Sequence, residues 1–180
     1  MTHDRLAEGD ALPSAQVLAK RFAVNRHTVR RAIEENLISG SDVFQIGIRG
    51  PLTSADQEEY CREQKINILD IDSFSDSKKR EQFIQLVHSK ANKGGKGKRR
   101  PVYLSFDVDG VDPAYAPGTG TPVVGGMTSR EALDFVRRLR GLDICGANVV
   151  EISPPYDHAE LTSLLGAALV FEFLSLMAVE

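Results

Sequence analysis

The sequence has few cysteines, no apolar stretch at its start and almost no excess of one charge. Cys61 and Cys145 are the two cysteines, and neither lies in a Cys-x-x-Cys pair. A disulfide framework is therefore not expected, and the absence of an apolar leader predicts a cytoplasmic protein. The net charge is −3, from 22 basic and 25 acidic side chains. Any binding to nucleic acid or to a membrane surface must then depend on a local patch, because the total charge would attract neither.

Long apolar runs are scarce as well. The longest, around residues 164–179, is interrupted by Glu172 and Ser175 and falls short of a membrane span, so it predicts a buried helix and no membrane partner. The composition, with 42% hydrophobic and 26% charged residues in 180, is that of a globular protein. A chain of this length can bury a core as one domain, or as a small module joined to a medium one.

Two kinds of pattern divide the chain near residue 40. Before it, short helices are predicted over residues 14–22 and again after Asn25, each with apolar residues four apart. After it, apolar strands alternate with helices, which predicts α/β structure: a three-layer α/β/α sandwich with a mainly parallel sheet. The expected strands cover 43–48, 66–71, 102–106 and 147–152, and the expected helices about 54–64, 77–89, 129–140 and 158–178. The basic segment over residues 90–100 is predicted to be a solvated loop.

Two aspartates follow the predicted strand over residues 102–106. Asp107 and Asp109 stand two residues apart, so both carboxylates project from the same side of the chain at the carboxyl end of a strand. Open α/β sheets place their ligand sites at that end. Because paired carboxylates repel each other unless a cation lies between them, the pair indicates a hard divalent metal.

The two aspartates also bear comparison with other acidic motifs. A lone Asp at this place would most simply cap a strand or turn. A calcium-binding loop starting at Asp107 would need Gly and Glu where Asp112 and Gly118 stand, so that motif is excluded. The FDxDG pattern also resembles the first motif of haloacid dehalogenase phosphatases. Those enzymes carry it on their first strand, whereas here it follows the third, and this reading is kept as a minor alternative.

A wider pattern surrounds the aspartates. The segments VFQIGIRGP, SFDVDGVDPAYAPGTGTPVVGGMTSREAL and GANVVEISPPYDHAELTSLLGAALVFEFL resemble the ureohydrolase family, in its agmatinase and guanidino-acid hydrolase branch. The likeness covers residues 43–180 and implies the C-terminal half of the arginase-like fold. It also implies hydrolysis of a small guanidino substrate, agmatine or a guanidino acid, to urea and an amine. Two Mn²⁺ ions would be the cofactor, and the chain would form an oligomer of identical subunits.

The resemblance also assigns roles to single residues. It implies that Asp107 and Asp109 are metal ligands, with Asp109 counted as catalytic as well, and that Glu151 receives the planar guanidinium through paired hydrogen bonds. Thr121 would lie on the substrate side. Taken without the family, Glu151 is a strand-end glutamate in solvent and Thr121 a simple loop residue. His158 is read as a surface residue at a helix start.

Two family motifs do not occur in the sequence. These are the Gly-Gly-x-His-Ser and Asp-Ala-His-x-Asp segments, which supply the remaining histidine and aspartate ligands. The chain's histidines are His3, His27, His88 and His158, and none has such a context. Two carboxylates are too few for an ordered binuclear site. We therefore expect the isolated chain to be inactive.

The start of the chain has a resemblance of its own. EGDALPSAQVLAKRFAVNRHTVRRAIE is similar to the helix-turn-helix of GntR-type repressors over residues 8–34. This implies a helix-turn-helix-like segment over 1–40, ahead of the ureohydrolase-like domain over 41–180. As an alternative function it implies a DNA-binding regulator with a degenerate guanidino-binding domain. The arginines could equally form a solvated helical face, and RRAIEENL also fits the ureohydrolase pattern. The residues predicted to contact DNA are Asn25, Arg26, His27 and Arg30.

Overall fold

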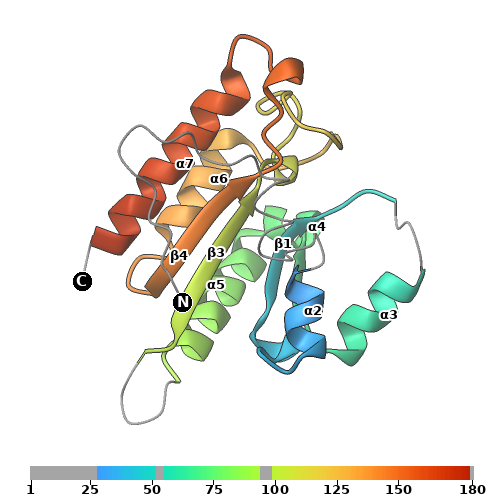
Figure 1. The fold of residues 1–180 in the computed structure, drawn as a ribbon, viewed down its shortest axis with the longest axis vertical. Helices are drawn as coiled ribbons and strands as arrows, with labels where there is room; N and C mark the ends of the chain where they lie inside the picture. Colours follow the sequence, from blue (N-terminus) through green and yellow to red (C-terminus); the bar gives the residue numbers. More distant parts are fainter. Residues whose placement is uncertain (1–27, 52–54, 94–98, 179–180) are drawn as a thin grey trace, which may run out of the picture. The chain divides into compact units, whose positions relative to one another are not determined.

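The computed structural model describes residues 28–51, 55–93 and 99–178 of the chain, which divides into two compact units, Met1–Ser39 and Gly40–Glu180. In the first unit, α2 (Thr28–Glu34) is the described helix (Figure 1). It carries two ion pairs one helical turn apart, Arg30 with Glu34 and Arg31 with Glu35. The helix expected over residues 14–22 lies outside the described residues.

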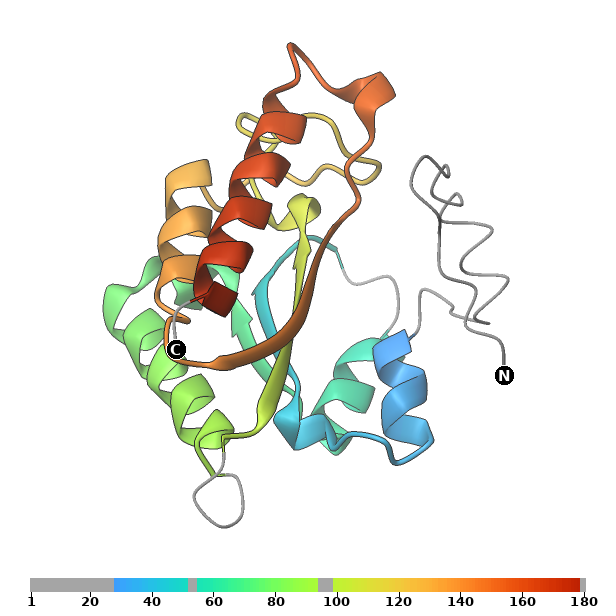
Figure 2. The same cartoon turned by 60° about the vertical axis from the view of Figure 1, so that its left-hand side comes forward.

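The second unit contains two pairs of parallel strands, β1 with β2 and β3 with β4. Connections between parallel neighbours must cross over the sheet, and α3 and α6 lie in these crossovers. In Figure 2, α5, α6 and α7 lie on one side of the strands and α3 on the other. The α/β class predicted from the sequence is confirmed, with the strands between helices. The bounds are β1 Phe44–Ile48, α3 Ala55–Glu63, β2 Asn67–Asp70, α4 Ile71–Ser75, α5 Ser77–Ala91, β3 Pro101–Asp107, α6 Ser129–Arg137, β4 Asp143–Val150 and α7 Leu161–Ala178, with short 3-10 turns η1 Gly40–Asp42, η3 Val108–Gly110 and η4 Pro154–Tyr156.

Side chains of β3 alternate between the helices and the opposite side. Phe106 is buried, and Val102 and Leu104 pack against the same core, whereas Tyr103 and Ser105 are exposed. This is the period of two expected of a strand with one covered face. Along the described chain, β3 is therefore covered on the side of α5, α6 and α7.

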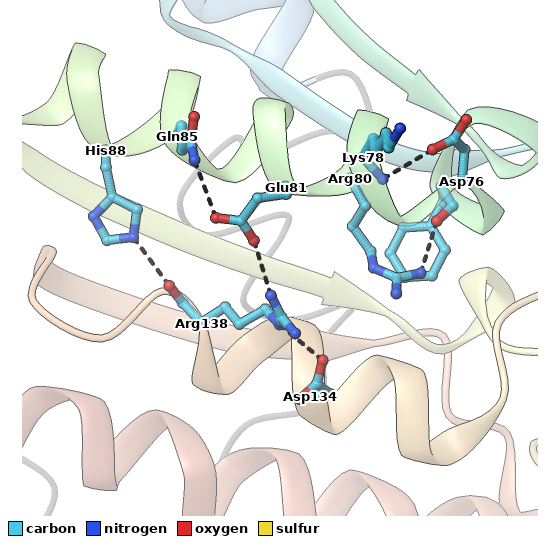
Figure 3. Close-up of polar contacts among 9 residues, drawn as sticks. Asp76, Lys78, Arg80, Glu81, Gln85, His88, Asp134 and Arg138 are labelled. Carbon is cyan, nitrogen blue, oxygen red and sulfur yellow. Dashed lines mark hydrogen bonds and ion pairs between the residues drawn. The ribbon is translucent and has the colours of Figure 1, made fainter.

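The three helices on that side are joined by apolar and polar contacts. Their buried side chains form one core with the strands. At the surface, Arg138 donates to Glu81 of α5 and to Asp134 of α6, and His88 Nε2 lies 3.0 Å from the Arg138 carbonyl oxygen (Figure 3). Exposed ion pairs of this kind contribute little to stability, so the apolar core holds the layer together.

Local capping sets several element boundaries that the apolar pattern did not give. The strand predicted to reach residue 71 ends at Asp70, because the Asp70 side chain accepts from the Ser73 amide and starts α4. Asp76 accepts from the amides of Lys78 and Lys79 and starts α5. The short helix α4 was not predicted.

Two sequence expectations need correction. Within the basic segment, Arg100 is bound by both guanidinium nitrogens to the Asp42 carboxylate, at 2.7 and 2.5 Å, so this end of the segment is anchored. The C-terminal helix α7 is long and apolar enough to cross a membrane by length and composition, contrary to the prediction. Core helices of soluble proteins satisfy the same test. One face of α7 is buried in the core, and 33% of its apolar window is buried overall.

Candidate functional site

Asp107 ends β3, and its carboxylate faces other acidic groups. Asp107 Oδ1 accepts a hydrogen bond from the Asp109 amide at 2.9 Å, which turns the chain into η3. Partial burial, with a smaller contribution from the negative charges of Asp109 and Glu151, raises the pKa of the Asp107 carboxyl to about 6 against the opposing amide hydrogen bond. Such a shift indicates carboxylates that converge on one place, which is common at functional sites.

The Asp109 carboxylate is held by two threonines from the loop that follows. Thr119 Oγ1 donates to one carboxylate oxygen and Thr121 Oγ1 to the other. Thr119 is buried, and its hydroxyl oxygen also lies 3.0 Å from the Glu151 carbonyl oxygen. The η3 turn at Asp109, the loop and the end of β4 thus meet at one hydroxyl group.

Glu151 follows β4 directly and adopts an unusual backbone conformation. Its φ is +65°, in the left-handed region where residues other than glycine are uncommon. The kink follows the end of the strand at Val150, two residues before the predicted end at residue 152. Glu151 Oε2 lies 3.9 Å from the position that a Cβ atom would take at Gly120. The carboxylate therefore lies against the same loop that holds Asp109. Strained residues of this kind cluster at functional sites.

Arg49, just after β1, holds the loop from the other strand pair. Its Nη2 donates to the carbonyl oxygen of Asp109 at 2.7 Å, and Nη2 and Nε both reach the carbonyl oxygen of Val123. A Cβ at Gly126 would lie 2.6 Å from the Asp112 amide nitrogen and 2.7 Å from Arg49 Nη2, so only glycine fits between this backbone and the guanidinium. The Arg49 guanidinium donates its hydrogen bonds to backbone carbonyl oxygens, which indicates a structural role for Arg49.

Asp112 organises the loop and does not join the carboxylate cluster. Its Oδ1 accepts from the Ala114 amide and its Oδ2 from the amides of Gly125 and Gly126. These amide hydrogen bonds, that of Ala114 first, keep the pKa of the Asp112 carboxyl below its ordinary value. The carboxylate thereby closes a ring from residue 112 to residue 126.

A second set of contacts joins this loop to the start of α7. The Gly118 amide donates to Thr162 Oγ1 at 2.7 Å, and the Ser153 amide donates to the Gly118 carbonyl oxygen at 2.8 Å. Asp157 accepts from the amides of Thr162 and Ser163 and from the Ser163 hydroxyl. The loop is thus fixed at both ends, by Arg49 and by the first turn of α7.

The structure brings together four of the residues named from the sequence: Asp107, Asp109, Thr121 and Glu151. Thr119 and Arg49, which the sequence reasoning missed, hold them in place. The repeated threonine in GTGTP was the available signal for Thr119. His158 is exposed next to the start of α7, as expected. Among the described residues, no group of three or more His, Cys, Asp or Glu side chains is placed to hold a metal ion.

The DNA-contact residues cannot be placed in a site. Asn25, Arg26 and His27 lie outside the described residues, and the Arg30 guanidinium in α2 pairs with Glu34 at 2.8 Å. DNA binding by this segment therefore stays a prediction.

The chain is similar in sequence and in fold to proteins of one known family. The sequence profile of the arginase family matches residues 19–175, a range that includes α2. A guanidinopropionase from Pseudomonas aeruginosa is 47% identical over 150 residues, and a mitochondrial agmatinase from Gallus gallus is 40% identical over 148. The solved structure of a proclavaminate amidino hydrolase from Streptomyces clavuligerus superposes with a TM-score of 0.73 at 38% identity.

The matches cover most of this chain but only part of each relative. They take in 83% of the chain and 45% of the guanidinopropionase, 82% and 42% for the agmatinase, and 84% and 48% for the amidino hydrolase. The chain thus spans somewhat less than half the length of the proteins it resembles. The likeness confirms the partial arginase-like fold expected from the sequence.

Proposed function

The chain belongs to the arginase family, in its agmatinase and guanidino-acid hydrolase branch, and from this premise we propose that it forms one half of a site that hydrolyses a guanidino compound to urea and an amine. The observation that carries the proposal is the meeting of Asp107, Asp109 and Glu151 at the carboxyl ends of two neighbouring parallel strands. Ligand sites of open α/β sheets lie at such strand ends. The relatives named guanidinopropionase and agmatinase supply the substrate class.

Glu151 is the group best suited to receive the guanidinium. A carboxylate can accept two parallel N–H bonds from a planar guanidinium, and Glu151 carries its carboxylate on a kinked backbone beside Gly120. A glycine at that position leaves room beside the carboxylate for a flat group. Thr121, whose hydroxyl donates to Asp109, would border the substrate on its other side.

Two Mn²⁺ ions are proposed as the cofactor, with Asp107 and Asp109 as ligands from this chain. When bound, such a pair supplies hydroxide at neutral pH. The donor chemistry fits in kind, since oxygen ligands suit Mn²⁺. It does not fit in number, because the described residues contain no group of three suitable side chains. We therefore expect no turnover by this chain alone.

Metal binding gives the most direct test of the site. We expect isothermal titration calorimetry to detect weak Mn²⁺ binding by the wild-type chain, with a Kd of about 10⁻⁴–10⁻³ M, in the range of weak oxygen-ligand sites. Asp109→Asn should abolish it. Asp143→Asn, which removes an exposed carboxylate at the opposite end of the same sheet, is the matched control and should change nothing. Binding that is insensitive to Asp109→Asn would contradict the assignment.

Urea release tests the activity itself. With Mn²⁺ and either agmatine or guanidinopropionate, the chain alone is expected to produce no urea above the rate of its Asp109→Asn variant. Turnover by the isolated wild-type chain would contradict the proposed incompleteness and would show that two carboxylates suffice. The cytoplasmic location stays a prediction, and several relatives, the agmatinase from Gallus gallus among them, are named as mitochondrial.

A further inference from the structure

The Thr119 hydroxyl lies between two acidic residues of the candidate site. Its Oγ1 is within hydrogen-bond distance of an Asp109 carboxylate oxygen and, at 3.0 Å, of the Glu151 backbone carbonyl oxygen. Thr119 is 4% exposed, so water has little access to this hydroxyl. In Figure 1 and Figure 2, the loop that follows η3 and the segment that follows β4 lie at the same end of the β3–β4 pair. The hydroxyl therefore joins two segments of the chain that carry the site.

A threonine hydroxyl carries a single hydrogen, and both neighbours of this hydroxyl can only accept. An ionised carboxylate and a backbone carbonyl have no hydrogen to give in return. The Thr119 hydroxyl can therefore donate to Asp109 or to Glu151, but not fully to both at once. The two hydrogen bonds that the oxygen positions allow are alternatives, selected by rotation of the O–H about the Cβ–Oγ1 bond. No proton leaves Thr119 in this exchange.

The oxygen atom of Thr119 is held in place while its hydrogen turns. Just before it in the chain, the Gly118 amide donates to Thr162 Oγ1 at 2.7 Å, and the Ser153 amide donates to the Gly118 carbonyl oxygen at 2.8 Å. The β-branched side chain of threonine is also stiff at χ1. Rotation of the hydroxyl hydrogen therefore changes the hydrogen-bond partner without any movement of the heavier atoms.

The charge on Asp109 decides between the two acceptors. Hydrogen bonds to an ionised group are roughly twice as strong as those between neutral groups. This difference corresponds to roughly a tenfold preference for the carboxylate over the carbonyl. We therefore expect the hydroxyl to donate to Asp109 while that carboxylate carries its full charge. Neutralising the charge, by a bound cation or by substitution, removes the preference and frees the hydroxyl to donate to the Glu151 carbonyl.

A hydrogen bond to the Glu151 carbonyl acts on a residue whose backbone is already strained. The φ of Glu151 is +65°, and left-handed conformations of this kind are held only when the surroundings restrain them. The Glu151 carboxylate lies beside Gly120, the residue directly after Thr119. Restraining the carbonyl restrains the backbone from which this carboxylate projects. The orientation of the Glu151 carboxylate is thereby linked to the charge on Asp109.

We propose that Thr119 is a positioning residue whose hydroxyl turns from the Asp109 carboxylate to the Glu151 carbonyl when the charge on Asp109 is neutralised. The Glu151 carboxylate is then held most firmly once a cation has taken up the charge of Asp109. This order of events rests on the proposed function, in which Asp109 binds a metal ion and Glu151 receives the guanidinium. The turn of the hydroxyl itself requires neither metal nor substrate, so it is measured without them.

The test follows the NMR chemical shift of the Glu151 carbonyl carbon in the full chain without metal. A carbonyl carbon moves to higher frequency when its oxygen accepts a stronger hydrogen bond. Asp109→Asn removes the charge and Asp109→Leu removes the acceptor, so the shift should increase from the wild type to Asp109→Asn and again to Asp109→Leu. Combined with Thr119→Val, which keeps the shape of threonine without its hydroxyl, the same changes should leave the signal in place. Thr119→Ser keeps a hydroxyl and should restore the movement.

Thr121→Val is the matched control, because Thr121 donates to the other oxygen of the same carboxylate. With Thr121→Val, the Asp109 substitutions should move the Glu151 signal as they do in the otherwise wild-type chain. A Glu151 signal that does not respond to the Asp109 substitutions overturns the inference. So does a response that survives Thr119→Val, or one that Thr121→Val abolishes equally.

Addition of Mg²⁺ separates this inference from the proposed function. Mg²⁺ takes oxygen ligands, and because it is diamagnetic it leaves the signals sharp, unlike Mn²⁺. In the wild type it should move the Glu151 signal in the same direction as Asp109→Asn does, and with Thr119→Val it should not. If Mg²⁺ moves no signal around Asp109 while the metal-free substitutions behave as expected, the positioning role stands and the proposed metal site fails. If Mg²⁺ binds only when Asp109 is present but leaves the Glu151 signal unmoved, the positioning role fails and the metal site stands.

Discussion

The inner and outer faces of α7 are both rich in apolar residues, but the inner face is buried in the core and the outer face is exposed. Leu169 on the inner face has no exposed surface and Leu164 on the outer face keeps 69% of its own. The same contrast runs along β3, where Phe106 is buried toward the helices and Tyr103 is 63% exposed on the other side. The helix side of this unit therefore supplies most of its buried apolar surface, while the carboxylate site lies at the end of the strands, where that coverage stops.

The largest expected effect on stability comes from replacing a leucine by alanine on the inner face of α7, compared with the same replacement on the outer face. Leu169→Ala should lower the free energy of unfolding by about 2–5 kcal/mol, because it leaves a cavity in a closely packed core. Leu164→Ala on the same helix should change it by less than about 0.5 kcal/mol. Urea denaturation followed by circular dichroism measures both. Similar losses for the two variants would show that the outer face is already covered, in the monomer or in an oligomer.

A smaller loss is expected at the seam where α7 meets the site loop. A Cβ at Gly118 would lie 2.5 Å from Asp157 Cβ and 2.8 Å from its Cα, too close for any side chain without backbone movement. Gly118→Ala should therefore cost about 1–3 kcal/mol of unfolding free energy, as other overpacked sites do. Gly141→Ala is unsuitable as a control because its φ is +90°, whereas Ser105→Ala changes an exposed strand residue and should be nearly neutral. A Gly118→Ala variant as stable as Ser105→Ala would show that the seam is loose.

The sequence pattern predicted the elements better than their ends. The alternation of apolar strands and helices placed each described strand of the second unit, since burial on a parallel sheet leaves near-continuous apolar runs. It missed that α7 begins at residue 161 and not at 158, because Ala159 and Glu160 have positive φ angles. Such turns depend on local hydrogen bonding that hydrophobic periodicity does not encode.

For the site, the sequence predicted the acidic residues but not the residues that hold them in place. The Asp-x-Asp spacing and the family resemblance indicated Asp107, Asp109 and Glu151. Thr119 was missed because a threonine in a glycine- and proline-rich loop reveals its partner only after the loop has folded. Arg49 is 60 residues away in sequence from the carbonyl that it binds, at Asp109. Contacts between residues so far apart in the chain depend on the order of the strands in the sheet, and a single sequence does not reveal that order.

The pH dependence of stability tests the contact between Asp157 and the first turn of α7. Burial opposes ionisation of the Asp157 carboxyl, but hydrogen bonds from Thr162 and Ser163 outweigh it and lower its pKa to about 2 from 3.8. Because the folded pKa lies below the unfolded one, the stabilisation is present above about pH 4 and is lost as the pH falls toward 2. Asp157→Ala should lower the Tm by about 3 °C at pH 7 and flatten the fall between pH 4 and 2.

Calorimetric scans at pH 7, 4, 3 and 2 measure the effect. Asp143→Ala, at the far end of the sheet, serves as control and should keep the wild-type pH dependence. An Asp157→Ala variant with the full wild-type acid transition would show that Asp157 does not anchor the first turn of α7.

The smallest effect is expected on the uncovered side of β3, and its size depends on whether that side stays uncovered. The Tyr103 ring lies over Gly146 of β4, since a Cβ at Gly146 would meet the ring at 3.1 Å. A cross-strand contact of this kind contributes about 0.2–1 kcal/mol, so Tyr103→Thr should cost no more than that in the isolated chain. Phe106→Leu on the covered side is the control, and should cost more because it opens space in the core. If Tyr103→Thr costs as much as Phe106→Leu, the open side is closed by contacts absent from the described residues, and the contrast between the two sides disappears.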